Sequence, residues 1–438
     1  MTMTTPNTAT TPGTTTHAVP APTVVSQQVA LTSETFVRTL ERAVIAVATG
    51  TAASLSPAMG HVKWIVADGR TTVESTNAEI GVRLTVDAET RGDGVFTLPG
   101  RLALDLAKGF PTGPVVLAHD AATRTTRIAA EIDPDYMDQA NIITHLRGYE
   151  PNEIVAPPPF EGVALFGIPS NDLLSAIGQV APCASDRSER AMLTGLCLRY
   201  TGDSLVFYTA DGWRMARRVV RLDGARLAVD RIVNLLTPAS LLARASGLLP
   251  HTDALTEIAS YPAGAPSHLV LRAEGVQVAS RLMDGPYVNA EQLVPRQVAT
   301  TARVTATRLA EAIRRSGYFV GTVDHKPIKL AIAPSLDGSG AGSLTVSAEN
   351  DPGDSTSKIV ADVTGPAITV VLNTRYISDA IKGAGTDQIE IGLNAATKPV
   401  VVRPIDGDDL VYVMAPINPT APVSPATAER GADDGTAR

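Results

Sequence analysis

The sequence predicts an α+β fold made of three similar tandem domains, each combining antiparallel sheet with two helices. Three observations lead to this prediction. Two different sets of helix-like segments each occur three times, and runs typical of β-strands fill the intervals between them. Because the spacing is 136 to 138 residues, each repeat is a whole domain and not a solenoid unit of roughly 20 to 50 residues.

The first set of predicted helices shares apolar residues at helical spacing after a polar or small start. Its members are residues 33–44, 170–181 and 306–317. The aligned apolar residues, 137 and 136 positions apart, are Phe36, Leu173 and Leu309. One helical turn later the same separations recur at Leu40, Ile177 and Ile313. This matched spacing predicts the first helix of each domain.

The second set of predicted helices shares an opening leucine and a final glycine that suits a helix C-cap. Its members are residues 98–109, 236–247 and 372–383. Their starts are 138 and 136 residues apart, in step with the first set. Two helical sets that repeat together predict two helices in each of three domains.

The intervals between the predicted helices contain short alternating or apolar runs bounded by Gly, Asp, Asn or Pro, a pattern typical of strands joined by hairpins. Such runs are residues 60–68, 204–211, 267–275, 328–335, 343–350 and 388–394. Proline-containing stretches at 153–162 and 293–301 indicate domain boundaries. The predicted organisation is a disordered tail at 1–27, domains at 28–156, 157–297 and 298–418, and a disordered tail at 419–438.

The composition is that of a soluble multidomain protein, since 44% of the 438 residues are hydrophobic and 19% are charged. No stretch approaches the roughly 18 apolar residues of a membrane span, and the N-terminus lacks the pattern of a secretory signal. These features predict a cytoplasmic location. The net charge of -8 argues against a general nucleic-acid coat, so any DNA contact needs a localised basic surface.

The sequence offers no constellation for enzyme, metal or cofactor chemistry. Cys183 and Cys197 are too few for a disulfide framework and lack zinc-site spacing, which predicts two buried thiols. The seven histidines show no metal or nucleophile motif. The glycine-rich residues 338–343 lack the lysine of a phosphate loop and are predicted to be a hairpin connection. We expect no catalytic residues, no metal and no cofactor.

Three strings of the sequence resemble the bacterial DNA polymerase III beta subunit family, the beta sliding clamps. They are TADGWRMA at 209–216, SRLMDGPYVNAEQLVP at 280–295 and LNTRYISDAIKG at 372–383. Their order and the triple repeat extend the resemblance over residues 28–418. It implies the DNA clamp fold, in which two chains close head to tail into a ring, with helices facing the hole and sheets outside.

The resemblance also implies a function without catalysis. A clamp of this family is a DNA polymerase processivity factor that encircles duplex DNA and holds replication and repair proteins on it. The implied partners are double-stranded DNA, bound without sequence preference, a second copy of the chain, and the DNA polymerase III alpha subunit, clamp loader and repair polymerases, bound through short linear motifs. The implied location is the nucleoid. Two alternatives stay open: a diverged paralogue, acting as a backup or inhibitor-tolerant clamp, and a peptide-binding scaffold that does not encircle DNA.

A protein that slides on DNA needs cations facing the phosphates and little directional contact with bases. Arg101 and Lys108 hold the fourth and eleventh places of one repeated segment, and Arg375 and Lys382 hold the same places in another. Because seven residues make about two helical turns, each pair shares a face. The first helices of domains one and three add Arg38, Arg42, Arg314 and Arg315, and the resemblance adds Arg187 and Arg190. The alternative is that such cations merely complement helix dipoles.

The resemblance implies that partner peptides bind a hydrophobic cleft between the second and third domains. Its expected lining is Leu193, Gly212, Trp213, Arg214, Met215, Val288, Leu293, Val413, Met414, Ala415, Pro416 and Ile417. An apolar cleft with one arginine and pliable methionines suits several related peptides. The alternative is that Met215, Leu193 and Val413 are ordinary core residues. The chain departs from the family's Phe-Pro-x-Tyr at 287–290 and has methionine for a common leucine at Met215, which changes the expected partner range.

Overall fold

The computed structural model describes residues 26–50, 54, 56–130, 142–222, 233–321, 326–335, 341–405 and 407–417. The predicted tails lie outside these ranges apart from Ser26 and Gln27, and Gln27 already belongs to the first strand. The chain divides into two compact units. The first comprises the residues up to Glu74 together with Thr85–Ile154, and the second comprises Ser75–Leu84 and the residues from Val155 onward.

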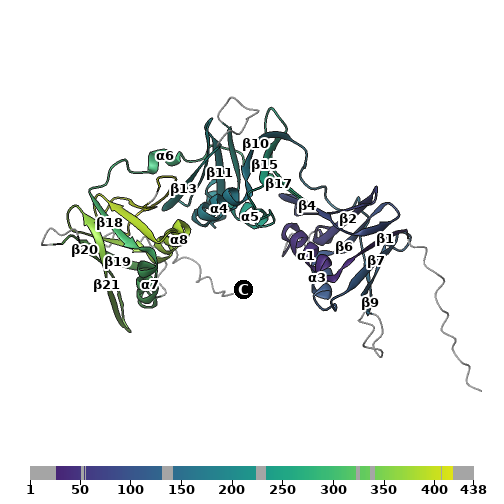
Figure 1. Cartoon of the computed structure of the whole chain (residues 1–438), viewed down its shortest axis with the longest axis horizontal. Helices are drawn as coiled ribbons and strands as arrows, with labels where there is room; N and C mark the ends of the chain where they lie inside the picture. Colours follow the sequence, from purple (N-terminus) through teal and green to yellow (C-terminus); the bar gives the residue numbers. More distant parts are fainter. Residues whose placement is uncertain are drawn as a thin grey trace, which may run out of the picture. The chain divides into compact units, whose positions relative to one another are not determined.

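Where the structure describes the first unit, it combines antiparallel strands with two α-helices whose bounds lie within the described residues (Figure 1). The helices are α1 (Ser33–Ala43) and α3 (Gly100–Ala107). The strands are β1 (Gln27–Thr32), β2 (His61–Ala67), β3 (Arg70–Thr76), β4 (Ile80–Val86), β5 (Glu89–Arg91), β6 (Gly94–Pro99), β7 (Pro114–Asp120), β8 (Thr125–Ala130) and β9 (Ile142–Arg147). One sheet has the order β5-β1-β7-β8-β9, and β2 pairs with both β3 and β6. The division between the units falls within β3 and β4.

An aromatic group forms the core of the first unit. Strand β2 alternates between partly exposed and buried side chains, and this alternation turns Trp64 inward. The Trp64 ring stacks on Phe96 of β6, with centroids 5.9 Å apart, and lies 6.0 Å from Phe36 of α1. Helix α1 begins where the Thr32 side chain accepts the backbone N–H of Thr35. The predicted apolar position Phe36 therefore fixes α1 on the sheet.

The second unit holds the other helices and strands. Its helices are α4 (Ser170–Val180), α5 (Ala239–Ser246), α6 (Ala290–Leu293), α7 (Ala306–Ser316) and α8 (Thr374–Ala384). Its strands are β10 (Val163–Pro169), β11 (Gly195–Tyr200), β12 (Ser204–Ala210), β13 (Arg214–Arg221), β14 (Val233–Pro238), β15 (Leu255–Tyr261), β16 (His268–Ala273), β17 (Val276–Arg281), β18 (Thr300–Thr305), β19 (Pro327–Ala333), β20 (Ala341–Asn350), β21 (Gly353–Thr364), β22 (Ile368–Asn373), β23 (Gln388–Leu393), β24 (Val400–Pro404) and β25 (Leu410–Met414).

A single antiparallel sheet of twelve strands runs through most of the second unit, in the order β14-β11-β12-β13-β25-β24-β23-β18-β21-β20-β19-β22. Near the middle of this sheet, β13 pairs with β25, and Met215 lies opposite Val413. We call this pairing the joint of the sheet. A second set of strands, β10-β15-β16-β17, continues through β17 onto Ile80–Leu84 of β4. The expected second and third domains therefore share one continuous ladder of backbone hydrogen bonds.

The three-fold repeat of an α+β unit predicted from the sequence is confirmed. Helices α1, α4 and α7 occupy the first set of segments, and α3, α5 and α8 occupy the second. The six quoted strand runs also correspond to strands, namely β2, β12, β16, β19, β20 and β23. In the glycine-rich stretch, residues 341–343 begin β20, while 338–340 lie outside the described residues.

The expectation that a final glycine ends each helix of the second set is wrong for α8. Gly383 lies inside α8, and the left-handed residue that ends the helix is Gly385, with φ 62°. Gly383 lacks a side chain for another reason, because a Cβ there would lie 1.8 Å from the hydroxyl oxygen of Tyr412. That hydroxyl donates a hydrogen bond to the carbonyl of Gln179 at the end of α4. The glycine therefore admits a tyrosine that links α8, β25 and α4.

The two faces of the twelve-stranded sheet are covered differently. Helices α4 and α8 pack against β13 and β25 on one face, and α7 packs beside α8 (Figure 1). On the other face lies an apolar cluster that includes Cys197, Tyr208, Met215 and Val413, covered by partly buried side chains from residues 283–298. The Tyr287 hydroxyl holds residues 283–298 against the sheet. It donates a hydrogen bond to the carbonyl of Gly195 and accepts one from the N–H of Ala210.

Both cysteines are buried and free, as predicted. Burial raises the pKa of the Cys183 thiol to about 12 and that of the Cys197 thiol to about 11. Such thiols stay protonated at neutral pH and behave as small apolar side chains.

Candidate functional site

Basic side chains stand on the helices of the first unit where the sequence predicts them. Arg38, Arg101 and Lys108 are exposed, whereas Arg42 is half-buried. Burial lowers the pKa of Arg42, and the nearby positive charge of Arg38 lowers it further, so these two guanidinium groups are neighbours. The Lys108 ammonium lies 3.1 Å from Glu41 of α1, with both side chains well exposed. An exposed pair of this kind holds its lysine only weakly, so Lys108 can turn to a phosphate.

The third repeat carries a similar group of cations. Arg314, Arg315, Arg375 and Lys382 are all exposed. Arg315 lies 3.7 Å from Glu311, and Arg375 lies 3.8 Å from Asp379, each one helical turn away. Sequence reasoning missed Arg308, which is also exposed on α7, seven residues before Arg315. The seven-residue spacing used for Arg101 and Lys108 could have identified it.

The middle repeat is less basic than the other two. Helix α4 contains no Lys or Arg, and the fourth and eleventh places of the α5 segment are Ala239 and Ser246, both buried. The exposed cation of α5 is Arg244, in its last turn. Sequence reasoning missed Arg244 because it occupies the ninth place of the repeat. No signal at the equivalent positions could have found it.

Arg187 and Arg190 belong to none of the α-helices. Arg187 is the N-cap of the 3₁₀ helix Ser188–Thr194, which precedes β11, and Arg190 lies at a kink within it. Arg190 reaches Gly212, because its guanidinium nitrogen is 2.7 Å from where a Cβ of Gly212 would stand. Leu193 approaches the same place at 3.7 Å. Gly212 has φ +94°, a backbone conformation that favours glycine. The structure therefore brings Arg190 together with the expected partner site, a neighbourhood that the sequence did not indicate.

The turn between β12 and β13 presents Trp213, whose residue surface is 60% exposed. The Asp211 carboxylate shapes this turn, since one of its oxygens accepts the backbone N–H groups of Trp213 at 2.8 Å and Arg214 at 2.9 Å. The carbonyl of Trp213 in turn accepts the N–H of Ala415 at 2.7 Å. Two residues on, the N–H of Ile417 donates to the carbonyl of Val371 on β22. Residues 415–417 thus join the turn to β22.

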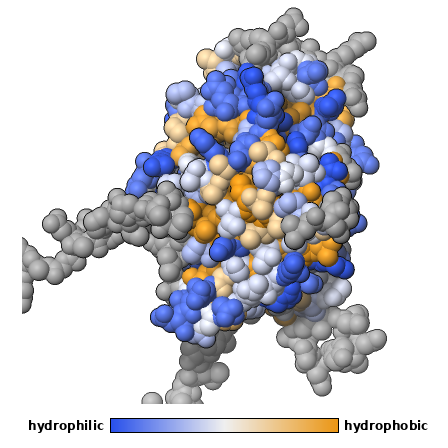
Figure 2. Space-filling view, turned by 90° about the vertical axis from the view of Figure 1, so that its left-hand side faces the viewer, coloured by the Kyte–Doolittle hydropathy of each residue, from blue (hydrophilic) through white to orange (hydrophobic). Residues whose placement is uncertain are grey.

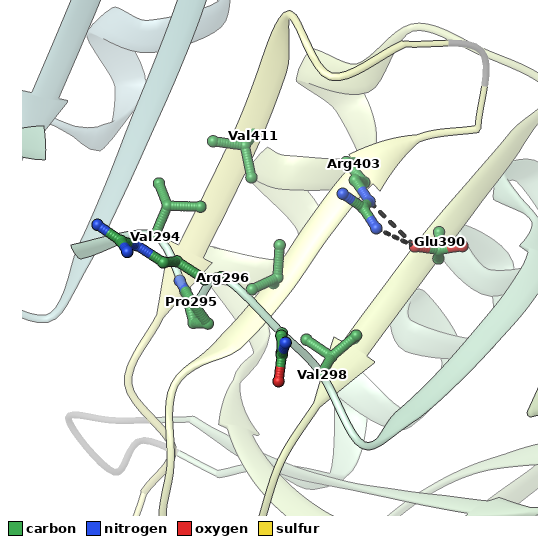
Figure 3. A pocket seen from close by; sticks show the side chains of 10 residues that line it. Val294, Pro295, Arg296, Val298, Glu390, Arg403 and Val411 are labelled. Carbon is green, nitrogen blue, oxygen red and sulfur yellow. Dashed lines mark hydrogen bonds and ion pairs between the residues drawn. The ribbon is translucent and has the colours of Figure 1, made fainter. Parts of the chain in front are cut away.

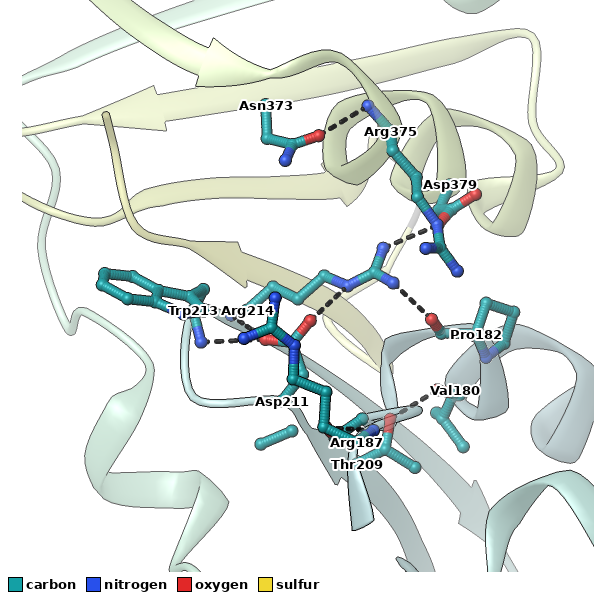
Figure 4. A network of polar contacts seen from close by, with 12 residues as sticks. Val180, Pro182, Arg187, Thr209, Asp211, Trp213, Arg214, Asn373, Arg375 and Asp379 are labelled. Carbon is teal, nitrogen blue, oxygen red and sulfur yellow. Dashed lines mark hydrogen bonds and ion pairs between the residues drawn. The ribbon is translucent and has the colours of Figure 1, made fainter. Parts of the chain in front are cut away.

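Arg214 lies at the centre of a polar network between β13, the end of α4 and helix α8 (Figure 4). Its guanidinium donates to Asp211 at 3.0 Å, to Asp379 at 2.6 Å and to the carbonyl of Pro182 at 2.5 Å. It also covers the Tyr376 ring, 4.4 Å from the centroid. Burial by itself lowers the pKa of Arg214, but the surrounding groups, Asp379 and Asp211 among them, more than offset this and raise it.

Four expected lining residues are buried inside the protein. Arg214, Met215, Val413 and Met414 expose between 2% and 6% of their surface. Met215 and Val413 belong to the apolar cluster on the covered face of the sheet. The guanidinium of Arg214 donates its hydrogen bonds to groups inside the protein. The core interpretation therefore holds for Met215 and Val413. Direct contact of these four residues with a peptide stays a prediction.

The remaining expected residues are all at least partly exposed. Trp213, Val288 and Leu293 are exposed apolar side chains, and Gly212 is exposed beside them in sequence. Leu193, Ala415, Pro416 and Ile417 are half-buried. This group combines apolar surface with the nearby guanidinium of Arg190.

Two hollows adjoin the segment that covers the sheet, and neither was predicted. One of about 610 Å³ is lined by Asn289, Glu291, Gln292, Val294, Pro295 and Arg296. The other, of about 50 Å³, lies between residues 294–298 and the sheet and is bordered by Glu390 and Arg403 (Figure 3). The Glu390 carboxylate accepts hydrogen bonds from Arg303 and Arg403. Burial raises the Glu390 pKa, but both arginines outweigh it, so the pKa is lowered.

Within the described residues, no group of His, Cys, Asp and Glu side chains could hold a metal ion. No helix among them is long and apolar enough to cross a membrane.

Sheet-rich domains repeated three times, basic residues at matching helical positions and an apolar site beside a joint of the sheet are features of the DNA clamp class. A family model described as "DNA polymerase III beta subunit, central domain" matches residues 167–289, and one described as its C-terminal domain matches residues 291–418. Together they span more than half of the chain. The chain belongs to the DNA polymerase III beta subunit family.

Similar proteins and structures agree with this family. The Beta sliding clamp of Synechococcus elongatus is 24% identical over 349 residues, covering 80% of this chain and 88% of that protein. The Beta sliding clamp of Bacillus subtilis is 23% identical over 369 residues, covering 82% and 92%. The solved DNA polymerase sliding clamp from Bacillus subtilis has a TM-score of 0.77 at 22% identity, covering 90% of this chain and 99% of that one. A sliding clamp from Pseudomonas aeruginosa bound to griselimycin also has a TM-score of 0.77, at 18% identity, with 90% and 100% coverage.

Proposed function

We propose that this chain is a sliding clamp that encircles duplex DNA and tethers the replicative polymerase and other replication or repair proteins. The observation that carries the proposal is the exposure of Arg101, Lys108, Arg375 and Lys382 at equivalent places of the repeated segments that contain α3 and α8. The chain as a whole carries a net charge of -8. Cations gathered on repeated helices in an acidic protein suit phosphate attraction without recognition of bases.

The proposed assembly is a head-to-tail homodimer closed into a ring, with the first domain of one chain against the third domain of the other. A heterologous contact that closes in this way gives a finite assembly. Figure 2 shows hydrophobic side chains among hydrophilic ones on the side of the molecule that carries β20 and β21 in Figure 1. Val360 of β21 is 71% exposed, and Tyr318 after α7 is 73% exposed. Exposed apolar surface of this kind supports a protein contact.

The proposed partner site is the exposed apolar group around Trp213, with Val288, Leu293 and the half-buried Leu193 and Ile417. Its occupants would be short linear motifs of the DNA polymerase III alpha subunit, the clamp loader and repair polymerases. A large aromatic side chain beside an arginine supports this role, since Trp and Arg are enriched among the residues that dominate binding energies. Met215 and Val413, which belong to the buried apolar cluster, would lie at the floor of this site.

The other parts of the proposal follow the family. The chain would act without catalysis, metal or cofactor, in the cytoplasm on the nucleoid. Its domains would be residues 28–156, 157–297 and 298–418. The two family models, at 167–289 and 291–418, support the second and third of these divisions.

Charge reversal tests the DNA contact. Changing Arg101, Lys108, Arg375 and Lys382 to glutamate should shorten retention on a circular DNA by at least tenfold, because four phosphate attractions become repulsions. Retention is measured after loading by the host's clamp loader, and circular dichroism checks the fold. A matched control reverses Arg70 and Arg221, two exposed cations on strands β3 and β13. Unchanged retention in the fourfold variant would leave the scaffold alternative as the better description.

A further inference from the structure

We infer that Asp379 is a positioning residue shared by the partner site and the DNA-facing surface, where it holds the Trp213 turn in place and weakens phosphate binding at Arg375. This inference rests on the proposed function. Asp379 lies on α8, and one of its carboxylate oxygens is 2.6 Å from a guanidinium nitrogen of Arg214 and 3.8 Å from Nε of Arg375. Figure 4 shows Asp379 joined to Arg214, with the Arg375 side chain next to it. One oxygen therefore serves two arginines, one buried next to the Trp213 turn and one exposed on α8.

The two arginines are held with very different strength. The side chain of Arg214 is 3% exposed, whereas that of Arg375 is 65% exposed. Removing one partner of a buried ion pair leaves an uncompensated charge and is strongly destabilising, but an exposed pair contributes little. Asp379 therefore stays with Arg214, while Arg375 is free to exchange its long contact for a phosphate.

The anchoring of Arg214 reaches the partner site through Asp211. Asp211 binds the guanidinium of Arg214 with one carboxylate oxygen and the backbone N–H groups of the turn with the other. Trp213 stands on this turn, and its carbonyl holds Ala415. If Asp379 loses its charge, Arg214 must draw its neutralisation from Asp211 alone. The guanidinium then shifts toward Asp211, and the turn that presents Trp213 loses its fixed position.

The effect on DNA has the opposite sign. A phosphate that approaches Arg375 also meets the negative charge of Asp379, which cancels part of the attraction. Helix α8 begins at Thr374, with the Asn373 side chain accepting the N–H of Arg375, so the backbone of Arg375 is fixed near the helix start. Removing the charge of Asp379 therefore leaves Arg375 in place and more attractive to phosphate.

The test is the variant Asp379→Asn in the full-length chain, with two probes. A fluorescent peptide from the C-terminus of the host's DNA polymerase III alpha subunit should bind about tenfold more weakly. A short fluorescent DNA duplex at low salt should bind about two- to threefold more tightly. The matched control is Glu311→Gln, which removes an exposed charge 3.7 Å from Arg315 on α7. This control should tighten DNA binding to a similar extent and leave peptide binding unchanged.

Two further variants separate the inference from a loss of folding. Asp379→Glu keeps the charge and should keep wild-type DNA affinity, while its longer side chain weakens the peptide. Asp379→Asn combined with Arg375→Gln should lose the gain in DNA affinity. A parallel fall of both affinities in Asp379→Asn, or a gain that persists without Arg375, overturns the inference. A wild-type chain that binds neither probe contradicts the proposed function and the inference with it.

Discussion

His119 is a titratable side chain in the core of the first unit, 5% exposed and stacked on Phe96 with ring centroids 5.1 Å apart. Its Nδ1 lies 3.0 Å from the hydroxyl of Thr126. Burial lowers the His119 pKa, although Asp120 and Glu150 act in the other direction. The unfolded chain therefore takes up a proton on this histidine at a higher pH than the folded chain does. The contribution of neutral His119 to the stability of the folded chain is fully present above the pKa of about 6.5 that this histidine has in the unfolded chain. It is lost as the pH falls below that value.

We expect His119 to lower the free energy of unfolding of the first unit between pH 7 and pH 5 by up to about 1.4 kcal/mol per pH unit, and His61, whose pKa burial also lowers, to add to this fall. Trp64 in the same core reports this transition in a Trp213→Phe background, because the chain has two tryptophans. His119→Gln keeps a hydrogen-bonding side chain but cannot titrate, so its pH slope should be smaller. Equal slopes for both proteins would show that His119 does not set this dependence.

At the scale of elements, the close approach of α8 to Tyr412 depends on Gly383. A methyl group there would lie 1.8 Å from the Tyr412 hydroxyl oxygen, far inside van der Waals contact. Gly383→Ala should therefore destabilise the second unit by about 1–3 kcal/mol. Gly178 in α4 is the matched control, because a Cβ there meets no atom within 4 Å. Gly178→Ala should raise stability by up to about 1 kcal/mol. Chemical denaturation compares the two, and equal effects would contradict this account of Gly383.

The sequence predicts those elements that depend on residues close together in the chain. It does not predict contacts that depend on tertiary packing. The six helices were predictable because apolar residues such as Phe36 and Leu309 recur at helical spacing. The contact of Tyr412 with Gly383, and its hydrogen bond to Gln179, arise from tertiary packing that no local pattern encodes. The burial of Met215 and Val413 likewise depends on the segment 283–298, which crosses a face of the sheet that periodicity cannot assign.

At the scale of the whole molecule, the joint between β13 and β25 unites the second and third domains in one sheet. Backbone pairs such as Met215 with Val413 must break before these domains separate. We therefore expect both domains to open in one cooperative step. Native-state hydrogen exchange should give amides of β12, β13, β24 and β25 the same free energy of opening. A distinctly lower value for β24 alone would mean that the third domain opens by itself.

The shared sheet also governs how the chain can be divided. A fragment that stops at residue 297 would leave β13 as an outer strand, with unpaired backbone donors and acceptors along its edge and the apolar face around Met215 partly uncovered. A fragment that begins at residue 298 would leave β25 in the same condition. Unpaired edges of this kind recruit other strands and lead to aggregation. We therefore expect the smallest soluble fragment that retains the Trp213 turn to contain both domains. The regions that the two family models match separately would not fold independently of each other.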